Sequence, residues 1–342
     1  LPAVYGTGSP KGNNAEMKTD GWELSLSWRD SFKLGGKPFD YSIKAMVWDS
    51  KSVITKYVND TGSLGTVKGF IENGGSPSSY YVGMTVGEIW GYTVAGLFRD
   101  QADIDSSAIH DFVQASDKVT RPGQVKIADL DGNGFIDPGN FAVDDHGDLR
   151  IIGNQSPRYR YGVNLSARWN GIGLSVFLQG VGARDWYPGS DAGMFWGKYG
   201  RPFFALIPSI HNYTDDMYSA ERNNWDTAYW PRMTTYQSNG TKNWTRLLEI
   251  PNTRYIQSAA YLRVKNIQLD YSFPKHICSA IRLQGLKIYV NAENLFTFTP
   301  LHKYAPNFDP EGLSYDSDFA SAADGYTYPI LKSVTVGVNI TF

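Results

Sequence analysis

Several features that place a chain in a common class are scarce in this 342-residue sequence. It contains one cysteine, Cys278, so it has no internal disulfide framework and no cysteine cluster for metal. No stretch approaches 18 consecutive apolar residues, which excludes a transmembrane helix. The net charge is only −2, so no basic field indicates a nucleic-acid partner.

Catalytic patterns are equally scarce. The five histidines are scattered, and no nucleophile lies beside a base in a recognisable motif. Asp144, Asp145 and His146 could resemble a metal or acid–base site, but they are typical of a solvated loop. We therefore expect a protein that is not an enzyme.

Alternating strands are what the sequence does contain, and the last twelve residues show them best. Val334, Val336, Val338 and Ile340 fall on one side of an extended strand, opposite small uncharged polar residues. Such a strand suits the edge of a soluble sandwich, and it is required in a transmembrane β-barrel. A mean hydropathy of −0.35 does not exclude the membrane, because barrel strands alternate too often to raise it.

The same alternation recurs upstream as hairpins. Residues 22–28 and 39–47 alternate around a tight Gly35-Gly36 turn, and residues 159–169 and 172–178 around Asn170-Gly171. A change of parity near Lys265-Asn266 predicts a β-bulge before the strand 267–273. Residues 286–292 and 331–342 complete about seven crossings.

The connections between these strands alternate in length. Long polar regions at about 51–155, 183–258 and 298–330 alternate with three short links. Outer-membrane barrels have short periplasmic turns and long extracellular loops, whereas a sandwich has no reason to segregate loops. This arrangement predicts an antiparallel transmembrane barrel segment with Lys44, Arg160 and Arg168 facing the lumen. Seven strands cannot close alone, and Leu1 is followed by no signal segment, so we expect a piece of a longer protein.

Six stretches carry a resemblance to a known family. They are NAEMKTDGWELSLSW at 14–28, GMTVGEIWGY at 83–92, IIGNQSPRYRYG at 151–162, AYLRVKNI at 260–267, NAENLFTF at 291–298 and VTVGVNITF at 334–342. Together they resemble the C-terminal third of the SusC/RagA family of TonB-dependent outer-membrane transporters of Bacteroidetes.

The resemblance implies that residues 1–342 form the last seven or so strands of a 22-stranded barrel in the outer membrane of a Gram-negative bacterium. It implies a SusD-like surface lipoprotein as partner, and energy from TonB delivered through an N-terminal plug domain. It implies oligosaccharides or oligopeptides as substrates. The plug and the signal peptide are not among these residues, and we expect the chain to fold only within a complete barrel.

An acidic loop predicts a calcium site. Asp129, Asp131 and Asn133 match positions 1, 3 and 5 of an EF-hand loop, with the Phe135 carbonyl at position 7 and Asp137 at position 9. The glutamate of position 12 is replaced by Asn140, so the predicted ligand set is incomplete. Asp144, Asp145 or Asp148 could substitute, and a loop held only by Asx-turns is the alternative.

The 183–258 region is rich in aromatic residues, which are unfavourable on exposed loops unless they bind or pack. Trp and Tyr rings stack on the apolar faces of sugars, so the candidate substrate-binding residues are Trp186, Tyr187, Trp196, Trp225, Tyr229 and Trp230. Packing within the loop or against a lipoprotein is the alternative for each ring. Two other functions stay open at this point, namely a soluble calcium-stabilised lectin-like protein and a passive porin.

Overall fold

The main element of the protein is one seven-stranded antiparallel sheet. The computed structural model describes residues 13, 15–58, 62, 64, 80–110, 120–188, 195, 216–232, 251–313 and 330–342. The strand order in the sheet is β1-β2-β7-β8-β11-β12-β13, in which every strand pairs with its sequence neighbours in the sheet. The seven strands are β1 (Ala15–Leu34), β2 (Lys37–Tyr57), β7 (Arg158–Trp169), β8 (Ile172–Ala183), β11 (Tyr261–Ser272), β12 (Gly285–Phe298) and β13 (Ser333–Thr341).

The two predicted hairpins are confirmed, because their turn residues supply the backbone conformations that tight turns need. Gly35 and Gly36 link β1 to β2 with φ of 58° and 78°. Asn170 and Gly171 link β7 to β8 with φ of 47° and 86°. Two successive positive φ values match the turn that follows the right-handed twist of paired strands. The third short link, between β11 and β12, contains the helix α5 (Lys275–Ala280).

The predicted bulge is also confirmed, and it keeps one face of β11 apolar. The pairing of β11 with both neighbours shifts between Val264 and Asn266. Strand β2 was predicted to end near residue 47, but it continues to Tyr57. The charged residues Asp49 and Lys51 interrupt the apolar alternation without interrupting the backbone pairing with β1.

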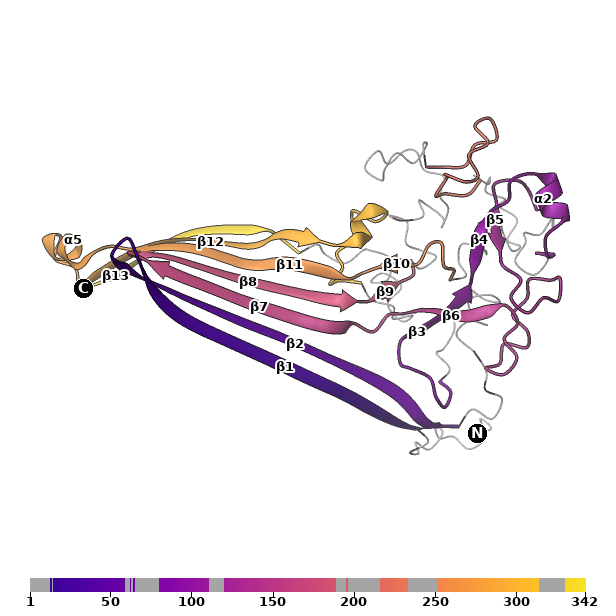
Figure 1. Ribbon diagram of the computed structural model, residues 1–342, viewed down its shortest axis with the longest axis horizontal. Helices are drawn as coiled ribbons and strands as arrows, with labels where there is room; N and C mark the ends of the chain where they lie inside the picture. The colour runs from indigo at the N-terminus through magenta and orange to yellow at the C-terminus, as the bar shows by residue number, and fades with distance from the viewer. Residues whose placement is uncertain are drawn as a thin grey trace, which may run out of the picture.

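The connections segregate at the two ends of the strands, as the loop lengths predicted. Figure 1 shows the short links and the C-terminus at one end and the long connections at the other. The long connections contain β3 (Glu88–Tyr92), β4 (Val94–Leu97), α2 (Gln101–Asp105), β5 (Val125–Ile127), β6 (Leu149–Asn154), β9 (Asp185–Trp186), β10 (Gln257–Ser258) and the 3-10 helix η2 (Pro300–Lys303). Strands β3 and β6, β4 and β5, and β9 and β10 form three small two-stranded sheets.

The hydrophobic core lies in these long connections rather than between the strands of the large sheet. It joins residues of all three connections, including Leu97, Leu149, Tyr187, Trp230 and Leu301. The large sheet is one layer thick, so its two faces are free to meet two different environments. The prediction of an all-β protein is confirmed.

Across the described ranges, no helix is long and apolar enough to cross a membrane.

Candidate functional site

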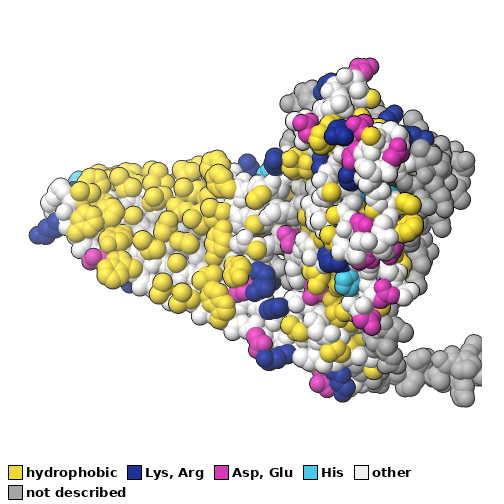
Figure 2. All heavy atoms as spheres, turned by 45° about the vertical axis from the view of Figure 1, so that its right-hand side comes forward, with side chains coloured by type: hydrophobic (Ala, Val, Ile, Leu, Met, Phe, Trp, Pro, Cys, Tyr) yellow, Lys and Arg dark blue, Asp and Glu magenta, His cyan; other side chains and the backbone are white. Residues whose placement is uncertain are grey.

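The outer face of the large sheet is apolar and uncovered. Leu26 is 62% exposed and Val336 is 72% exposed, although both lie in the middle of strands. Figure 2 shows apolar side chains covering the strand half of this face, while charged side chains gather over the long connections. The exposed apolar residues on it include Trp22, Leu24, Leu26, Trp28, Ile43, Leu174, Leu269, Ile288, Val290, Val334, Val336, Val338 and Ile340.

The inner face carries the alternate residues, which are polar and mostly small. One row of paired residues crosses the whole sheet through Ser31, Asp40, Arg168, Gly173, Asp270, Tyr289 and Gly337. The next row contains Ser42, Ser166 and Ser175, and the Ser42 and Ser166 hydroxyls are 2.8 Å apart. Such a wall suits contact with water or with a polar ligand.

An ionic cluster occupies the inner face near the short links. The Asp270 carboxylate is buried, and its Oδ1 lies 3.2 Å from Lys287 Nζ and 4.0 Å from Arg168 Nη2. Gly173 makes room for it, since a Cβ there would lie 2.7 Å from Asp270 Oδ2. Both cations are attracted to the one carboxylate, so the cluster links the ends of β7, β11 and β12.

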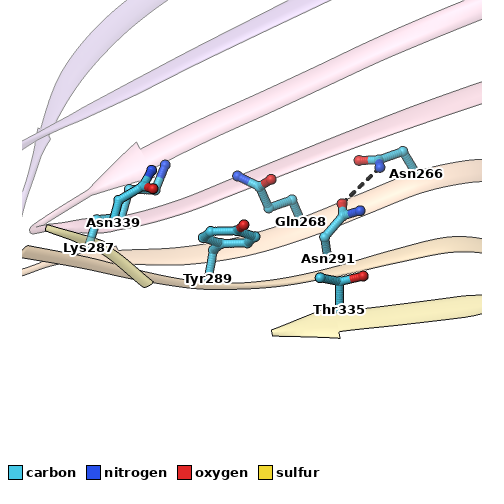
Figure 3. Close-up of a pocket in the computed structure, with 7 residues that line it drawn as sticks. All are labelled: Asn266, Gln268, Lys287, Tyr289, Asn291, Thr335 and Asn339. Carbon is cyan, nitrogen blue, oxygen red and sulfur yellow. Dashed lines mark hydrogen bonds between the residues drawn. The ribbon is translucent and has the colours of Figure 1, made fainter. Parts of the chain in front are cut away.

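Beside this cluster lies an open hollow of about 350 Å³ on the inner face. Its lining comes from β11, β12 and β13, and Figure 3 shows the side chains projecting to one side of the sheet. The lining residues are Asn266, Gln268, Lys287, Tyr289, Asn291, Thr335 and Asn339. The alternation within each strand gives no reason to group these residues. Their grouping depends on the register between strands.

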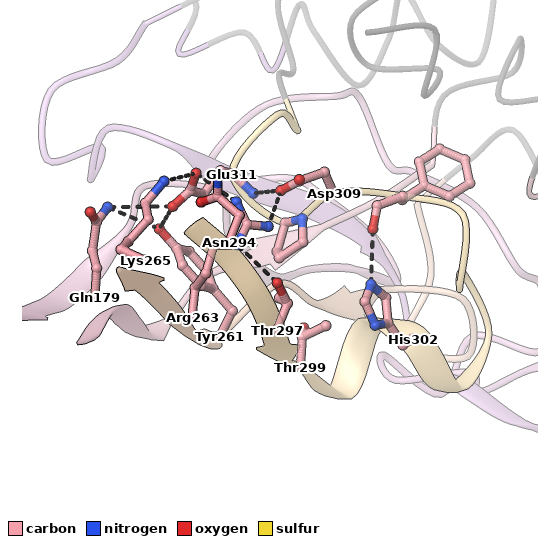
Figure 4. Close-up of polar contacts among 12 residues, drawn as sticks. Gln179, Tyr261, Arg263, Lys265, Asn294, Thr297, Thr299, His302, Asp309 and Glu311 are labelled. Atoms are coloured by element: carbon pink, nitrogen blue, oxygen red, sulfur yellow. Dashed lines mark hydrogen bonds and ion pairs between the residues drawn. The ribbon is translucent and has the colours of Figure 1, made fainter. Parts of the chain in front are cut away.

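A second polar network fastens the segment after η2 to the sheet (Figure 4). The Arg263 side chain is 3% exposed and donates to Thr297 Oγ1 at 2.8 Å, to Glu311 Oε2 at 2.8 Å and to Asp309 Oδ1 at 2.7 Å. Glu311 also accepts from Lys265 Nζ at 2.9 Å and from the Tyr261 hydroxyl at 2.9 Å. This network is not predictable from the sequence, because its two acidic residues, Asp309 and Glu311, lie in a loop without periodicity.

The predicted substrate-binding aromatics divide into buried and partly exposed rings. Trp186, Tyr187 and Trp230 are at most 2% exposed. Trp186 packs on Phe308 with ring centroids 4.9 Å apart. This packing removes the exposed ring face that a sugar stack needs, so the structure does not support these three residues as substrate contacts.

Trp225 and Tyr229 are only partly buried against the same core. Tyr229 stacks on Tyr304 with a centroid distance of 3.6 Å and an interplanar angle of 3°. One face of Tyr229 is therefore already used by the fold. Trp196 lies outside the described residues.

The acidic loop brings part of the predicted calcium ligand set together. Oxygen atoms of Asp129, Asp131 and Asp148 lie within 4.8 Å of one another. Gly134 makes the sharp turn with φ of 85°, as the motif requires. Of the three acidic residues considered for the missing position, Asp148 is the one that lies in this group.

The remaining predicted ligands are placed differently. Asp137 lies outside the group of three, because its carboxylate accepts from Gly139 N at 2.7 Å and from Asn133 Nδ2 at 3.0 Å. Phe135, the predicted carbonyl ligand, is 50% exposed.

The electrostatic environment of this loop disfavours the charged form of the Asp148 carboxyl when no cation is nearby. Burial raises the pKa of the Asp148 carboxyl above its usual range, and the charges of Asp131 and Asp129 act in the same direction. Backbone N–H groups that donate to Asp148 come from Leu130 at 2.6 Å and Asp137 at 3.0 Å. The N–H of Gly134 has the opposite effect on Asp129, whose pKa it lowers. Oxygen ligands at this spacing are those that hard cations prefer.

Comparison with known proteins shows what the chain is similar to. No protein-family model matches the chain. The chain aligns over its whole length with TonB-dependent receptor P3 of Formosa agariphila at 24% identity, and the alignment covers 30% of that receptor. It aligns equally completely with TonB-dependent receptor P26 of the same bacterium at 22% identity, covering 31% of that receptor. The resemblance to a TonB-dependent transporter is confirmed. The chain thus spans less than a third of the length of the receptors it matches.

Solved structures agree with the fold of this receptor-like chain. It superposes over its full length on 31% of a chain in the structure of the RagAB peptide transporter, with a TM-score of 0.57 at 17% identity. The RagAB peptide importer in its open-open state gives a TM-score of 0.58 over 30% of that chain, also at 17% identity. The relatives are named receptors and transporters, which supports a role other than catalysis.

Proposed function

We propose that residues 1–342 form the C-terminal part of the barrel of a SusC-like TonB-dependent importer. In this proposal the seven strands are the last of a 22-stranded barrel in the outer membrane of a Gram-negative bacterium of the Bacteroidetes. The full-length protein supplies the remaining strands and the plug domain through which TonB acts. The imported nutrient is an oligosaccharide, with an oligopeptide as the alternative.

The observation that carries this proposal is the uncovered apolar face of a sheet whose other face is polar. In water, an apolar surface of this extent would favour association or aggregation. In a lipid bilayer it is stable, because the outward residues contact hydrocarbon and every backbone group can pair within a closed barrel. The soluble lectin-like alternative leaves this face unexplained.

The shared core of the three long connections supports a partner on the extracellular side. Connections that pack into one core, as Tyr187, Trp230 and Leu301 do, present a fixed surface to a surface lipoprotein. The structures that the chain resembles are titled RagAB peptide transporter and RagAB peptide importer. This likeness supports a SusD-like lipoprotein as partner, and it keeps a peptide substrate open.

Calcium bound by the acidic loop is part of the proposal, as a structural ion. Asp129, Asp131 and Asp148 would hold it, and it would offset most of the negative charge of three carboxylates in one extracellular loop. Calcium titration of the full-length protein should give saturable binding that Asp131→Asn and Asp148→Asn weaken. Asp144→Asn is the matched control, and equal binding by all variants would reject the site.

Uptake in whole cells tests the importer. Cells of the native host with the full-length gene, or with the gene deleted, would be given fluorescent neutral hexasaccharides and hexapeptides. Gene-dependent uptake that stops when a protonophore removes the energy source supports a TonB-dependent importer. Uptake that persists without energy indicates a passive porin, and a full-length protein that stays soluble without detergent contradicts the barrel.

A further inference from the structure

A border of charged residues follows the apolar outer face of the large sheet on the side of the long connections. On β1, Trp22 is followed on the same face by Asp20. On β2, Val47 is followed on that face by Asp49 and then by Lys51. Figure 2 shows Lys and Arg side chains near this edge of the apolar face. The outer surface therefore changes from apolar to charged within a short length of each strand.

One lysine of this border has no carboxylate to pair with. Three ion pairs occupy the other charges, namely Lys18 with Asp20 at 2.9 Å, Lys56 with Glu16 at 3.1 Å and Arg158 with Asp49 at 2.5 Å. Lys51 stands opposite Asp20 in the register of β1 and β2, but Lys18 already holds that carboxylate. In the part of the chain that the structure describes, the exposed Lys51 side chain has no acidic partner. Lys51 thus leaves an uncompensated positive charge at the border.

The backbone at Tyr159 fixes a second cation on the same face. Tyr159 has a φ of 51°, which is rare for a bulky residue, and its N–H donates to Asp49 Oδ1 at 3.2 Å. Arg158 Nε and Nη2 donate to the two Asp49 oxygens at 2.6 and 2.5 Å, and Arg158 Cζ lies 5.4 Å from the centroid of the Tyr159 ring. Among the described residues, Arg158 Nη1 has no hydrogen-bond partner. A guanidinium held in one position therefore keeps one of its NH2 groups open.

These two cations lie close together, on strands that already have both neighbours. Asp49, which holds Arg158, and Lys51 are alternate residues of β2, so their backbones are about 7 Å apart. Strand β2 lies between β1 and β7, and β7 lies between β2 and β8. Further strands of the proposed barrel would join at β1 and β13, and a plug would occupy the lumen on the opposite face of the sheet. The outer face around Lys51 and Arg158 is therefore complete within these residues.

The surroundings of the two cations fit a phosphate that is carried on a lipid. Guanidinium and ammonium groups are the usual partners of phosphate in proteins. Trp22 and Tyr159 are 51% and 48% exposed beside them, and such rings are typical of the headgroup level of a membrane. Acyl chains would lie on the apolar residues that follow on the same face, such as Leu24 and Val47. A free phosphate would make no use of this apolar surface.

We propose that Lys51 and Arg158 bind the phosphate of a phosphorylated glycolipid in the outer leaflet of the outer membrane. Its acyl chains would lie along the apolar face of β1, β2 and β7. Lys51 supplies the uncompensated charge, and Arg158 Nη1 supplies a donor whose position is fixed by Asp49. This proposal rests on the proposed function, which places the long connections, and therefore this border, on the extracellular side.

Lipid binding by the full-length protein tests the site. The protein would be purified from outer membranes, delipidated in detergent and titrated with lipid A, with dephosphorylated lipid A and with phosphatidylglycerol, and bound lipid would be counted by native mass spectrometry. The main variant is Lys51→Gln, because Lys51 is exposed and its loss leaves no carboxylate unpaired. Lys56→Gln is the matched control, since it removes the same charge from the same strand at a lysine already paired with Glu16.

Lys51→Gln should weaken binding of lipid A roughly fivefold, the effect of one basic residue on binding to an anionic lipid, and Lys56→Gln should change it little. Lys51→Arg should retain binding. Arg158→Lys should weaken it, because a lysine that stays on Asp49 has no second NH2 group to offer. Dephosphorylated lipid A should bind the wild-type protein more weakly than lipid A does.

Two results would overturn the site. One is equal binding of lipid A by the wild-type protein and Lys51→Gln, and the other is tighter binding of phosphatidylglycerol or dephosphorylated lipid A than of lipid A. A full-length protein that does not enter the outer membrane would instead refute the proposed function.

Discussion

The buried Arg263 guanidinium and the partly buried Asp309 carboxylate form an ion pair across 46 positions of sequence, with Nη2 2.7 Å from Oδ1. The pair joins β11 to the segment that follows η2. Arg263 is 3% exposed, so its charge depends on Asp309 and Glu311 for compensation. A planar guanidinium is needed here because it donates in three directions at once.

Replacing Arg263 should release the segment that its network holds. Arg263→Ala leaves two partly buried carboxylates without their shared partner, although Glu311 keeps Lys265, so the loss should be smaller than the roughly 3–5 kcal/mol of a fully buried pair. We expect faster hydrogen exchange over residues 300–313 in the full-length protein. Arg263→Lys should restore little, because a lysine cannot make the three bonds.

Lys56→Ala is the control for this experiment. Lys56 pairs with Glu16 at 3.1 Å, but both side chains are more than half exposed. Surface pairs of this kind contribute little to stability. Equal exchange in Arg263→Ala and Lys56→Ala would show that the buried network does not hold the segment.

Gly337 is expected to be intolerant of even one methyl group. A Cβ there would overlap the Tyr289 ring at 2.2 Å, so Gly337→Ala should lower the temperature at which the folded band is lost in an outer-membrane gel assay. Tyr289→Ser should relieve the overlap, and the double variant should be more stable than Gly337→Ala alone. Gly285→Ala is the control, because its nearest neighbour would be Thr341 at an ordinary 3.6 Å. Additive losses in the double variant would contradict this contact.

The two faces of β1 should respond in opposite ways to a charge. Leu26 lies on the exposed apolar face, and Ser27 is the next residue on the polar face. Leu26→Arg should reduce the amount of folded barrel in the outer membrane, since arginine facing mid-membrane lipid costs roughly 2–4 kcal/mol. Ser27→Arg should be tolerated. Equal insertion of the two variants would count against a lipid-facing outer surface.

His110 is expected to make one connection sensitive to acid. The Ile127 N–H donates to His110 Nε2 at 3.0 Å, so Nε2 carries no proton and Nδ1 donates to the Ala108 carbonyl at 2.7 Å. Burial lowers the pKa of His110 in the folded protein, and the nearby charge of Lys126 acts the same way. The folded form therefore favours neutral imidazole.

The sign of the pH effect follows from this depression. The stabilisation that neutral His110 gives the folded connection is fully present above the unfolded pKa of about 6.5. This stabilisation is lost as the pH falls below that value, because only the unfolded connection takes up the proton readily. Hydrogen exchange over residues 124–128, corrected for intrinsic rates, should rise on acidification. His110→Asn should remove that dependence, and an unchanged pH profile in the variant would contradict the role of His110.

Local patterns in the sequence determined the strands and their turns. Alternation with period two assigns each strand an apolar and a polar face without knowledge of its neighbours, as at Val334, Val336 and Val338. The turns at Gly35-Gly36 and Asn170-Gly171 were equally readable, because few residues adopt positive φ there. The shift near Asn266 was visible as a break in the same period.

Contacts between distant residues could only be decided by the tertiary structure. Nothing near Asp148 in the sequence distinguishes it from Asp144 or Asp145, yet the fold turns only Asp148 toward Asp129 and Asp131. The aromatic loop has no period, so the sequence could not separate rings that pack from rings that bind. The rings of Trp186 and Trp230 are buried in a core that residues from all three connections build, which no local pattern predicts. Likewise, Gln268, Tyr289 and Asn339 lie on three different strands, so only the register between those strands places them around one hollow.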